Sequence, residues 1–275
     1  MTTNGFDEYG YYGENNGPLP PTKKIREMTE DERQRATVRY HSNRRKGKTM
    51  IKATLIDHMG SDLSVVNAAR VSFGKKSEWD QSELGQPVLS LKDRNLIRYL
   101  AKHKHLSPFG HAFASFHVKA PIFVARQLVK HKFLRWNEIS RRYVDEEPEF
   151  YVPDVWRGRS EDKKQGSSDE VVRFDNDGFS LCAETALLNK HALDLYNDMV
   201  QAKVAPEQAR MVLPQSTMTE WYWSGSLDAF ASMCKLRCAS DTQYETRVVA
   251  DQISKAMLKL FPVSWEALMK GETND

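Results

Sequence analysis

The densest group of side chains that could do chemistry lies between residues 126 and 142. It contains seven cationic or imidazole side chains: Arg126, Lys130, His131, Lys132, Arg135, Arg141 and Arg142. So many positive charges in a short segment repel one another unless an anionic group, such as a phosphorylated ligand, neutralises them. Hydrogen-bonding side chains, which a purely electrostatic patch would not need, interrupt the cations: Gln127, Asn137, Glu138 and Ser140. We interpret the segment as a phosphate-ligand site, with a solvated basic helix end as the alternative.

A second candidate surrounds a helix that is predicted over residues 227–236. Ser226 precedes this helix, and the free N–H groups at a helix start can face an anion. Arg237 follows about three turns later, at the other end of the helix. Taken alone this pattern says little, because serine caps are common and an arginine at a helix end often only offsets the helix dipole.

The histidines and cysteines form no recognisable metal or nucleophile motif. No H-E-x-x-H pair occurs, and no cysteine or carboxylate stands at a zinc-ligand spacing from His103, His105, His111 and His117. An odd number of cysteines builds no disulfide framework and fits a reducing compartment; they are Cys182, Cys234 and Cys238. Since no activating base is evident beside any of them, we expect no cysteine nucleophile and no metal.

Length and composition limit the class of protein. The chain has 275 residues, a net charge of +3 and 40% hydrophobic residues, which is enough to bury one large core. No stretch approaches the roughly 18 consecutive apolar residues of a membrane helix, and the polar start lacks the apolar region of a signal peptide. We therefore expect a cytoplasmic protein without a membrane partner. The near balance of charge gives little support to a nucleic-acid partner.

Three regions are expected along the chain. Residues 1–50 are polar and then basic, and are expected to be a flexible N-terminal extension. An arm that touches nucleic acid or a neighbouring subunit is the alternative to a solvated extension. Residues 51–265 are expected to form the folded domain, and residues 266–275 a tail.

Hydrophobic spacing predicts the elements that must position the candidate side chains. Alternation predicts strands over 51–58 and 111–120. Helical spacing predicts helices at 64–72, 91–102, after Pro121 and carrying the basic cluster, and at 183–203, 209–213, 227–236 and 246–260. Residues 157–178 are rich in glycine, serine and charges, and are expected to be a surface loop or the start of a helix. Together these indicate an α+β fold, a helix-rich single domain with a modest mixed or antiparallel sheet.

Several segments, in a fixed order, give these features a common interpretation. Lys130-His131-Lys132 is followed after seven residues by Ser140, and residues 137–143 read Asn-Glu-Ile-Ser-Arg-Arg-Tyr. Residues 105–111 read His-Leu-Ser-Pro-Phe-Gly-His, and further motifs lie at 209–214, 236–237 and 243–245. These segments resemble those of the flavin-dependent thymidylate synthases, and the resemblance covers residues 51 to about 261.

The resemblance implies reductive methylation of dUMP at C5 to dTMP, without a cysteine nucleophile, by a catalytic domain over 51–265. It implies methylenetetrahydrofolate as carbon donor, FAD as hydride carrier and NADPH as reductant. It also implies the fold of the family and sites that lie between the subunits of a homotetramer. Arg237 is the implied catalytic residue, since a permanently charged guanidinium against the pyrimidine can stabilise its N3-deprotonated form.

The same resemblance gives the remaining site residues their implied ligands. The implied dUMP-binding residues are Gln127, Lys130, Glu138, Ser140, Arg141, Arg142, Arg210 and Arg237. The implied flavin-binding residues are Ser107, Lys130, His131, Lys132, Glu138, Ser226 and Asp228.

The chain departs from the family pattern at some of these positions. Lys130 and Lys132 replace two arginines, so the charge remains but the planar fork that grips a phosphate at two points is lost. A usual serine is Arg135 in this chain. Three polar positions near the start of the 227–236 helix also differ, so flavin contacts from there should differ residue by residue; they are Ser226, Asp228 and Ser232.

Two other functions remain open at this stage. A related enzyme that methylates or hydroxymethylates another pyrimidine nucleotide could carry the same motifs. A nucleic-acid-binding module could use the basic N-terminal residues and the cluster at 130–142. Such a module would bind DNA or RNA with a steep salt dependence and would carry no chromophore.

Deletion of residues 1–45 should leave a folded protein that retains flavin, because the composition of this segment places it outside the catalytic domain. Size-exclusion chromatography and flavin absorbance of the truncated and full-length chains check this expectation. A truncated chain that fails to assemble or loses its flavin would show that the segment packs across a subunit boundary instead.

Overall fold

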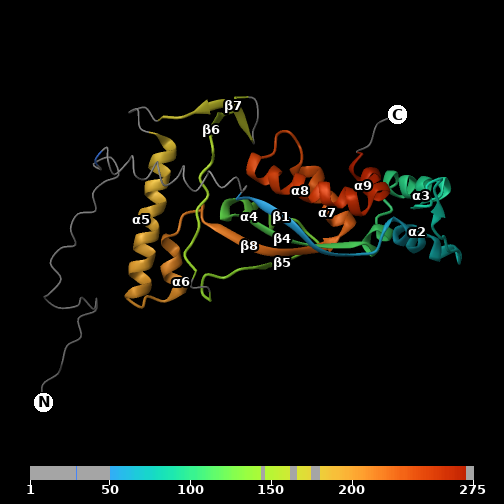
Figure 1. Ribbon diagram of the computed structural model, residues 1–275, viewed down its shortest axis with the longest axis horizontal. Coiled ribbons are helices and arrows are strands. Elements are labelled where there is room, and N and C mark those ends of the chain that lie inside the picture. The colour runs from blue at the N-terminus through green and yellow to red at the C-terminus, as the bar shows by residue number, and fades with distance from the viewer. Residues whose placement is uncertain (1–28, 30–49, 144–145, 162–165, 175–179, 271–275) are drawn as a thin grey trace, which may run out of the picture.

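The computed structural model describes residues 29, 50–143, 146–161, 166–174 and 180–270, arranged as Figure 1 shows. The expected N-terminal extension lies almost wholly outside these ranges, as do residues 271–275 of the expected tail. The first strand begins at Lys52, and the last helix continues past residue 265 to Met269. The domain boundaries themselves stay a prediction.

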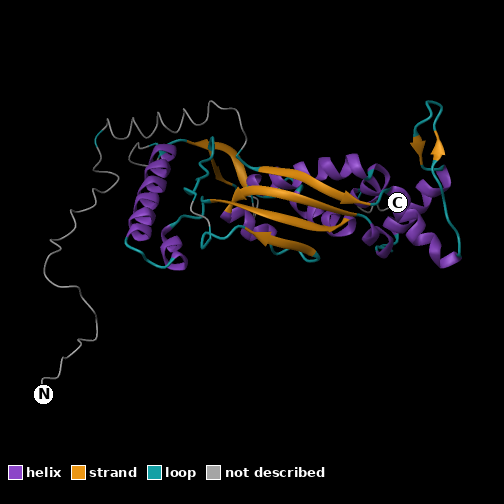
Figure 2. Ribbon diagram, turned by 60° about the horizontal axis from the view of Figure 1, so that its bottom comes forward, coloured by secondary structure: helices purple, strands orange, loops and turns teal. Residues whose placement is uncertain are grey.

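A four-stranded antiparallel sheet forms the centre of the fold (Figures 1 and 2). Its strands lie in the order β1 (Lys52–Met59), β4 (Phe113–Pro121), β8 (Met218–Ser226) and β5 (Leu134–Glu138). Strands β4 and β8 pair along their whole length, from Phe113 opposite Ser226 to Pro121 opposite Met218. The predicted strands over 51–58 and 111–120 are confirmed as β1 and β4, and the predicted α+β class is confirmed.

Alternation along β4 gives the sheet one buried face and one polar face. Ala114, Phe116 and Val118 are buried in the core, because successive side chains of a strand point to opposite faces. On the polar face, Glu220 of β8 is a shared partner for two side chains of β4. Its carboxylate oxygens lie 2.9 Å from His117 Nε2 and 3.4 Å from Lys119 Nζ.

Three helices cover the buried face: α4 (Ile122–Leu128), α7 (Leu227–Arg237) and α8 (Tyr244–Leu260). Phe230 of α7 packs edge to face against Phe116 and Trp223, with ring centroids 5.3 and 5.6 Å apart. Trp136 of β5 stacks on Trp221 at 4.4 Å. Aromatic side chains bury large areas, so these contacts hold α7 firmly over the β4–β8 pair.

Asp62 joins the two ends of the described domain. It begins α2 (Asp62–Arg70), is buried, and accepts hydrogen bonds from the main-chain N–H groups of Val263 and Ser264 at 3.0 and 2.9 Å. These N–H groups belong to the first turn of α9 (Pro262–Met269), where they have no partner within the helix. The carboxylate therefore satisfies the start of a helix about 200 residues away in sequence.

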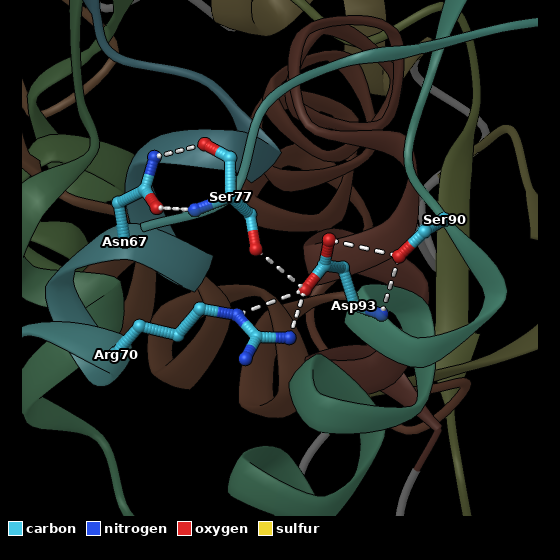
Figure 3. Close-up of polar contacts among 5 residues, drawn as sticks. All are labelled: Asn67, Arg70, Ser77, Ser90 and Asp93. Carbon is cyan, nitrogen blue, oxygen red and sulfur yellow. Dashed lines mark hydrogen bonds and ion pairs between the residues drawn. The ribbon is translucent and has the colours of Figure 1, made fainter. Parts of the chain in front are cut away.

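A second buried carboxylate, Asp93, joins α2 to α3 (Leu91–Lys102), as Figure 3 shows. It accepts hydrogen bonds from Arg70 Nε and Ser77 Oγ, both at 3.0 Å, and from Ser90 Oγ at 2.8 Å. Asn67 in turn pairs with the main chain of Ser77. Burial alone would raise the pKa of Asp93, but the hydrogen bonds from Arg70, Ser90 and Ser77 outweigh it and lower the pKa.

The opposite end of the sheet carries α5 (Leu181–Gln201), α6 (Pro206–Ala209) and the short 3-10 helix η4 (Arg210–Val212). The helix predicted at 183–203 is confirmed as α5, whereas the one predicted at 209–213 is divided between α6 and η4. The hairpin of β6 (Trp156–Arg159) and β7 (Ser167–Val172) lies between this end and α8. No helix among the described residues is long and apolar enough to span a membrane.

Two predictions about local structure are wrong. Residues 157–178, expected as a loop or helix start, include the β6–β7 hairpin, whose cross-strand hydrogen bonds need few apolar side chains. The helix after Pro121 ends at Leu128 and carries only Arg126 of the basic cluster, whose other cations lie in the following turn, in β5 and after β5. The spacing of hydrophobic residues did not predict strands β5 and β8 or helix α9. The helices expected at 64–72, 91–102, 227–236 and 246–260 are confirmed as α2, α3, α7 and α8.

Replacing Asp93 with alanine should lower the free energy of unfolding by roughly 3 kcal/mol, because the largely buried Arg70 would be left without its charged partner. Chemical denaturation at pH 7 measures this, with exposed Asp80→Ala as the control, expected within about 0.5 kcal/mol of wild type. Since the pKa of Asp93 is lowered, the difference should shrink as the pH falls below about 4. Equal stability of the two variants at pH 7 would contradict this role.

Candidate functional site

The basic segment begins in the turn between α4 and β5, residues 129–133. Phe133 has a left-handed φ of 65° and a side chain that is 85% exposed, a conformation that costs a bulky residue about 1–3 kcal/mol. The next residue, Leu134, pairs with Gly225 of β8. A Cβ at residue 225 would lie 3.1 Å from the carbonyl oxygen of Phe133, so glycine permits this close approach. The turn is thereby held beside the junction of β8 and α7.

His131 of this turn contacts Arg237 at the end of α7. The Nε–H of Arg237 donates to His131 Nε2 at 3.0 Å, which requires that Nε2 carry no proton. Burial, and then the positive charge of Arg237, lower the pKa of His131 to about 4. Burial also lowers the pKa of Arg237, whose guanidinium nevertheless stays charged at pH 7. The neutral imidazole of His131 thus accepts a hydrogen bond from the charged guanidinium of Arg237.

Lys130 and Lys132 flank His131 and are both exposed. Within the described part of the chain neither side chain forms an ion pair or a hydrogen bond. An anion near this turn would meet two cations that no carboxylate has neutralised. Each lysine acts as a point charge rather than as a planar fork.

Gln127 of α4 is oriented by the start of α8. Its Nε2 donates to Gln243 Oε1 at 2.5 Å, and its Oε1 accepts from Thr246 Oγ1 at 3.2 Å. Gln243 is the residue immediately before α8. The structure therefore brings the motif at 243–245 next to a residue with an implied nucleotide contact.

Glu138 closes β5, and both of its carboxylate oxygens already have donors. Thr219 Oγ1 donates to Oε1 at 2.6 Å, and Trp136 Nε1 donates to Oε2 at 3.1 Å. A carboxylate oxygen can accept more than one hydrogen bond, so an N–H or O–H group of a ligand can still bind. The two donors fix the direction in which the carboxylate faces.

The residues after β5 form a polar turn in which one arginine is anchored. Arg141 Nη1 donates to the carbonyl oxygen of Glu146 at 2.6 Å. Arg142 Nε donates to Ser140 Oγ at 3.3 Å, and its guanidinium lies 5.0 Å from the ring centroid of Tyr143. Arg142 remains exposed, so its charge faces solvent.

Glu245 is a nearly buried carboxylate at the start of α8, and its sequence surroundings indicate only that it belongs to a motif. Arg157 Nη2 lies 2.6 and 2.8 Å from its two oxygens, and Tyr151 donates its hydroxyl at 3.2 Å. Burial and the Glu245 carboxylate raise the pKa of Tyr151. The carboxylate fastens the β6–β7 hairpin to α8. No signal around residue 157, in a segment expected to be irregular, could have revealed the partner.

Ser226 and Asp228 lie at the start of α7, next to the 3-10 helix that carries Ser107. Ser107 is exposed in the 3-10 helix η3 (Ser107–His111), and the N–H of Leu227 donates to the carbonyl oxygen of Ala112 at 2.8 Å, which joins η3 to α7. Ser226 is the N-terminal cap residue of α7. The Oδ1 atom of Asp228 is buried and has no hydrogen-bond partner among the described residues. Such an unpaired acceptor is costly, so a donor from a ligand would stabilise it.

The structure divides the candidate residues between the two ends of α7. His131, Gln127 and Arg237 gather near its end, whereas Ser107 and Asp228 lie near its start. The helix has 11 residues, so its ends are about 16 Å apart. Ser232 lies exposed on α7 between them.

Arg210 belongs to neither end of α7. It begins η4, which packs against α5 and α6 at the other end of the sheet. Among the described residues no hydrogen bond joins Arg210 to Arg237. One chain alone therefore does not bring all the candidate residues together.

The residues present fit a flavin dinucleotide. Its pyrophosphate needs cations, and Lys130 and Lys132 are unpaired among the described residues. Its ring and hydroxyl groups need polar partners, which the hydroxyl of Ser107 and the unpaired Oδ1 of Asp228 could supply. Because Asp228 is a carboxylate, it suits an N–H or O–H group and not the phosphates.

Curated relatives share most of this chain. A flavin-dependent thymidylate synthase of Thermus thermophilus is 38% identical over 213 residues, which cover 78% of this chain and 73% of the relative. The enzyme of the same name from Thermosipho melanesiensis is 36% identical over 217 residues, covering 78% and 89%. The solved structure of the UMP/dUMP methylase PolB from Streptomyces cacaoi, bound with 5-Br dUMP, is similar with a TM-score of 0.67. It is 33% identical and covers 80% of this chain and 95% of that one.

A family model described as "Thymidylate synthase complementing protein" matches residues 54–263. The matched region runs from β1 into the first turn of α9, so it includes the sheet and both ends of α7. Sequence and fold therefore agree. The chain belongs to the family of the thymidylate synthase complementing proteins, the flavin-dependent thymidylate synthases.

Proposed function

We propose that this chain catalyses the reductive methylation of dUMP at C5 to dTMP, with methylenetetrahydrofolate as carbon donor and NADPH as reductant. Membership of the family supports the reaction, and the similar structure of a UMP/dUMP methylase supports a pyrimidine nucleotide as substrate. The observation that carries the proposal is the charged Arg237 beside the turn with two unpaired lysines. Arg237 offers one fixed cation for a base, and the turn offers two cations for a phosphate.

The pyrimidine must be activated before its C5 can form a bond to carbon, because uracil C5 is a poor nucleophile. An enzyme can add a thiolate at C6 or can favour negative charge on the ring. Cys234 is fully buried, and burial raises the pKa of its thiol, so it is poorly suited to act as a nucleophile. We assign activation to Arg237, whose guanidinium would lie against the ring and stabilise its N3-deprotonated form.

The nucleotide would be held by residues on several elements. The basic members would neutralise the phosphate, and the hydrogen-bonding members would orient the sugar and base. We propose as dUMP-binding residues Gln127, Lys130, Glu138, Ser140, Arg141, Arg142, Arg210 and Arg237.

The bound flavin, FAD, would supply hydride transfer, which no side chain can supply. Lys130 and Lys132 would neutralise its pyrophosphate, and the unpaired oxygen of Asp228 would accept one of its donors. We propose as flavin-binding residues Ser107, Lys130, His131, Lys132, Glu138, Ser226 and Asp228. Because each lysine is a point charge and lacks the planar fork of an arginine, we expect the protein to retain FAD more weakly, and with more sensitivity to salt, than it would with arginines at residues 130 and 132.

A complete site would need more than one subunit. Arg210 lies at the other end of the sheet from Arg237 in one chain, which supports sites assembled between the subunits of a homotetramer. Neighbouring subunits and two phosphorylated ligands would then neutralise the basic cluster. All three cysteines are free, which suits a reducing compartment, and we place the enzyme in the cytoplasm.

The proposed reaction predicts a yellow protein that forms dTMP from dUMP, methylenetetrahydrofolate and NADPH. Absorbance near about 450 nm reports the flavin, and mass spectrometry of the product separates methyl from hydroxymethyl transfer. UMP in place of dUMP tests the alternative acceptor. A protein with no flavin affinity at low salt and steeply salt-dependent binding to DNA would overturn the proposal in favour of a nucleic-acid-binding module.

Replacing Arg237 with alanine should lower turnover by roughly 10²–10³, the scale for losing one preorganised electrostatic contact, and should weaken dUMP binding. The rate at which NADPH bleaches the flavin without nucleotide should change much less, because that measurement needs no activated pyrimidine. Stopped-flow absorbance of both half-reactions tests the difference. Lys235→Ala, an exposed cation two residues away on α7, is the control and should leave both rates unchanged. Equal slowing of both half-reactions by Arg237→Ala would assign Arg237 to the flavin or the fold.

A further inference from the structure

The hydrogen bond between Arg237 and His131 is a contact that the proposed reaction leaves unused. We infer that His131 is a positioning residue for Arg237: its Nε2 holds the guanidinium Nε–H and so fixes the plane in which the two Nη groups face the substrate. This inference rests on the proposed function, since it assigns a purpose to the orientation of Arg237. It adds to the flavin contact that the family resemblance implies for His131.

The geometry follows from the donor pattern of arginine. A guanidinium is planar and carries five N–H groups, of which Nε has one and the two Nη atoms have four. When Nε donates to His131 at 3.0 Å, the four Nη–H groups remain for a ligand. The ring contact and the covalent attachment together determine the guanidinium plane. Among the described residues His131 is the one hydrogen-bond partner of the Arg237 side chain.

The two partners are held by separate elements, so the contact has a defined length and direction. The N–H of His131 donates to the carbonyl oxygen of Leu128 at 3.1 Å, and Leu134 ties the turn to Gly225 of β8. Arg237 ends α7, which the buried Phe230 anchors to the sheet. The main chain of neither partner can move toward the other without moving the sheet edge or the helix.

The surroundings of His131 favour an acceptor at this position. Arg237 approaches from α7, and Lys130 and Lys132 flank the ring on its own turn. Three positive charges around a half-buried ring disfavour a further positive charge on it. A protonated ring would turn an N–H toward the N–H of Arg237 and break the contact. A lysine or arginine at residue 131 could not accept the hydrogen bond at all.

A double-mutant cycle tests whether His131 acts through Arg237. At saturating flavin and nucleotide, His131→Ala should lower turnover roughly 10- to 100-fold, the cost of misplacing a catalytic group. His131→Gln should recover most of the loss, because an amide oxygen can accept from Nε–H. In the Arg237→Ala background, His131→Ala should lower turnover by less than about 2-fold, since residues that act through each other are not additive. His191→Ala on the distant α5 is the matched control and should behave as wild type in both backgrounds.

Two outcomes would overturn the positioning role of His131, and a third would overturn the proposed function. An equal fold-loss from His131→Ala in both backgrounds would overturn the inference while leaving the proposed function intact. A loss confined to flavin affinity, with unchanged turnover once flavin is saturating, would also overturn it and would leave His131 as a flavin ligand only. If the wild-type enzyme forms no methylated product, the proposed function fails. The NMR signal of the Arg237 Nε–H then still tests whether the hydrogen bond to residue 131 exists. This proton should be protected from exchange with water in wild type and in His131→Gln, and should lose that protection in His131→Ala.

Discussion

Strands β4 and β8 pair residue by residue along their whole length, and this register determines where the site residues can lie. Since β4 occupies one edge of β8, β5 must pair with the other edge, where Leu134 lies opposite Gly225. That pairing brings the end of the α4–β5 turn to the start of α7. The same register buries Phe116 and Trp223 under Phe230, which directs α7 across the sheet. The positions of the basic turn and of α7 therefore depend on the register of one antiparallel strand pair.

The cations of the site are distributed according to what surrounds them. Arg141 and Arg157 each have an acceptor within the chain, a carbonyl oxygen for Arg141 and a carboxylate for Arg157, which holds each guanidinium in place. Lys130 and Lys132 have no such partner among the described residues, and their mutual repulsion is relieved only when an anion binds. His131 avoids adding to this charge because burial and Arg237 keep its ring neutral. A basic cluster that would destabilise an empty fold becomes favourable once ligands are bound.

The start of α7 shows a different chemistry from its end. There the buried Oδ1 of Asp228 has no partner within the described part of the chain, and the cap residue Ser226 makes no side-chain hydrogen bond to the helix. Both polar groups are held in place by α7 and can accept a donor from a ligand. The flavin, as we propose it, would meet cations on the turn and an acceptor at the helix start. Two separated regions of opposite character suit a ligand with a pyrophosphate at one part and N–H and O–H donors at another.

Local periodicity was enough to predict the α+β class, most of the helices and the strands β1 and β4. The order of the motifs was enough to predict the family. Neither was enough for β5, β8 or the β6–β7 hairpin, since a Trp-Tyr-Trp run or a Gly- and Ser-rich segment becomes a strand when a partner strand lies beside it. Candidate site residues could be proposed from their motifs, but the partners that hold these residues in the fold could not. The contacts of His131 with Arg237 and of Glu245 with Arg157 join residues 106 and 88 positions apart. Such contacts depend on the three-dimensional fold, because sheet register and helix packing fix the distance between side chains that the chain itself leaves far apart.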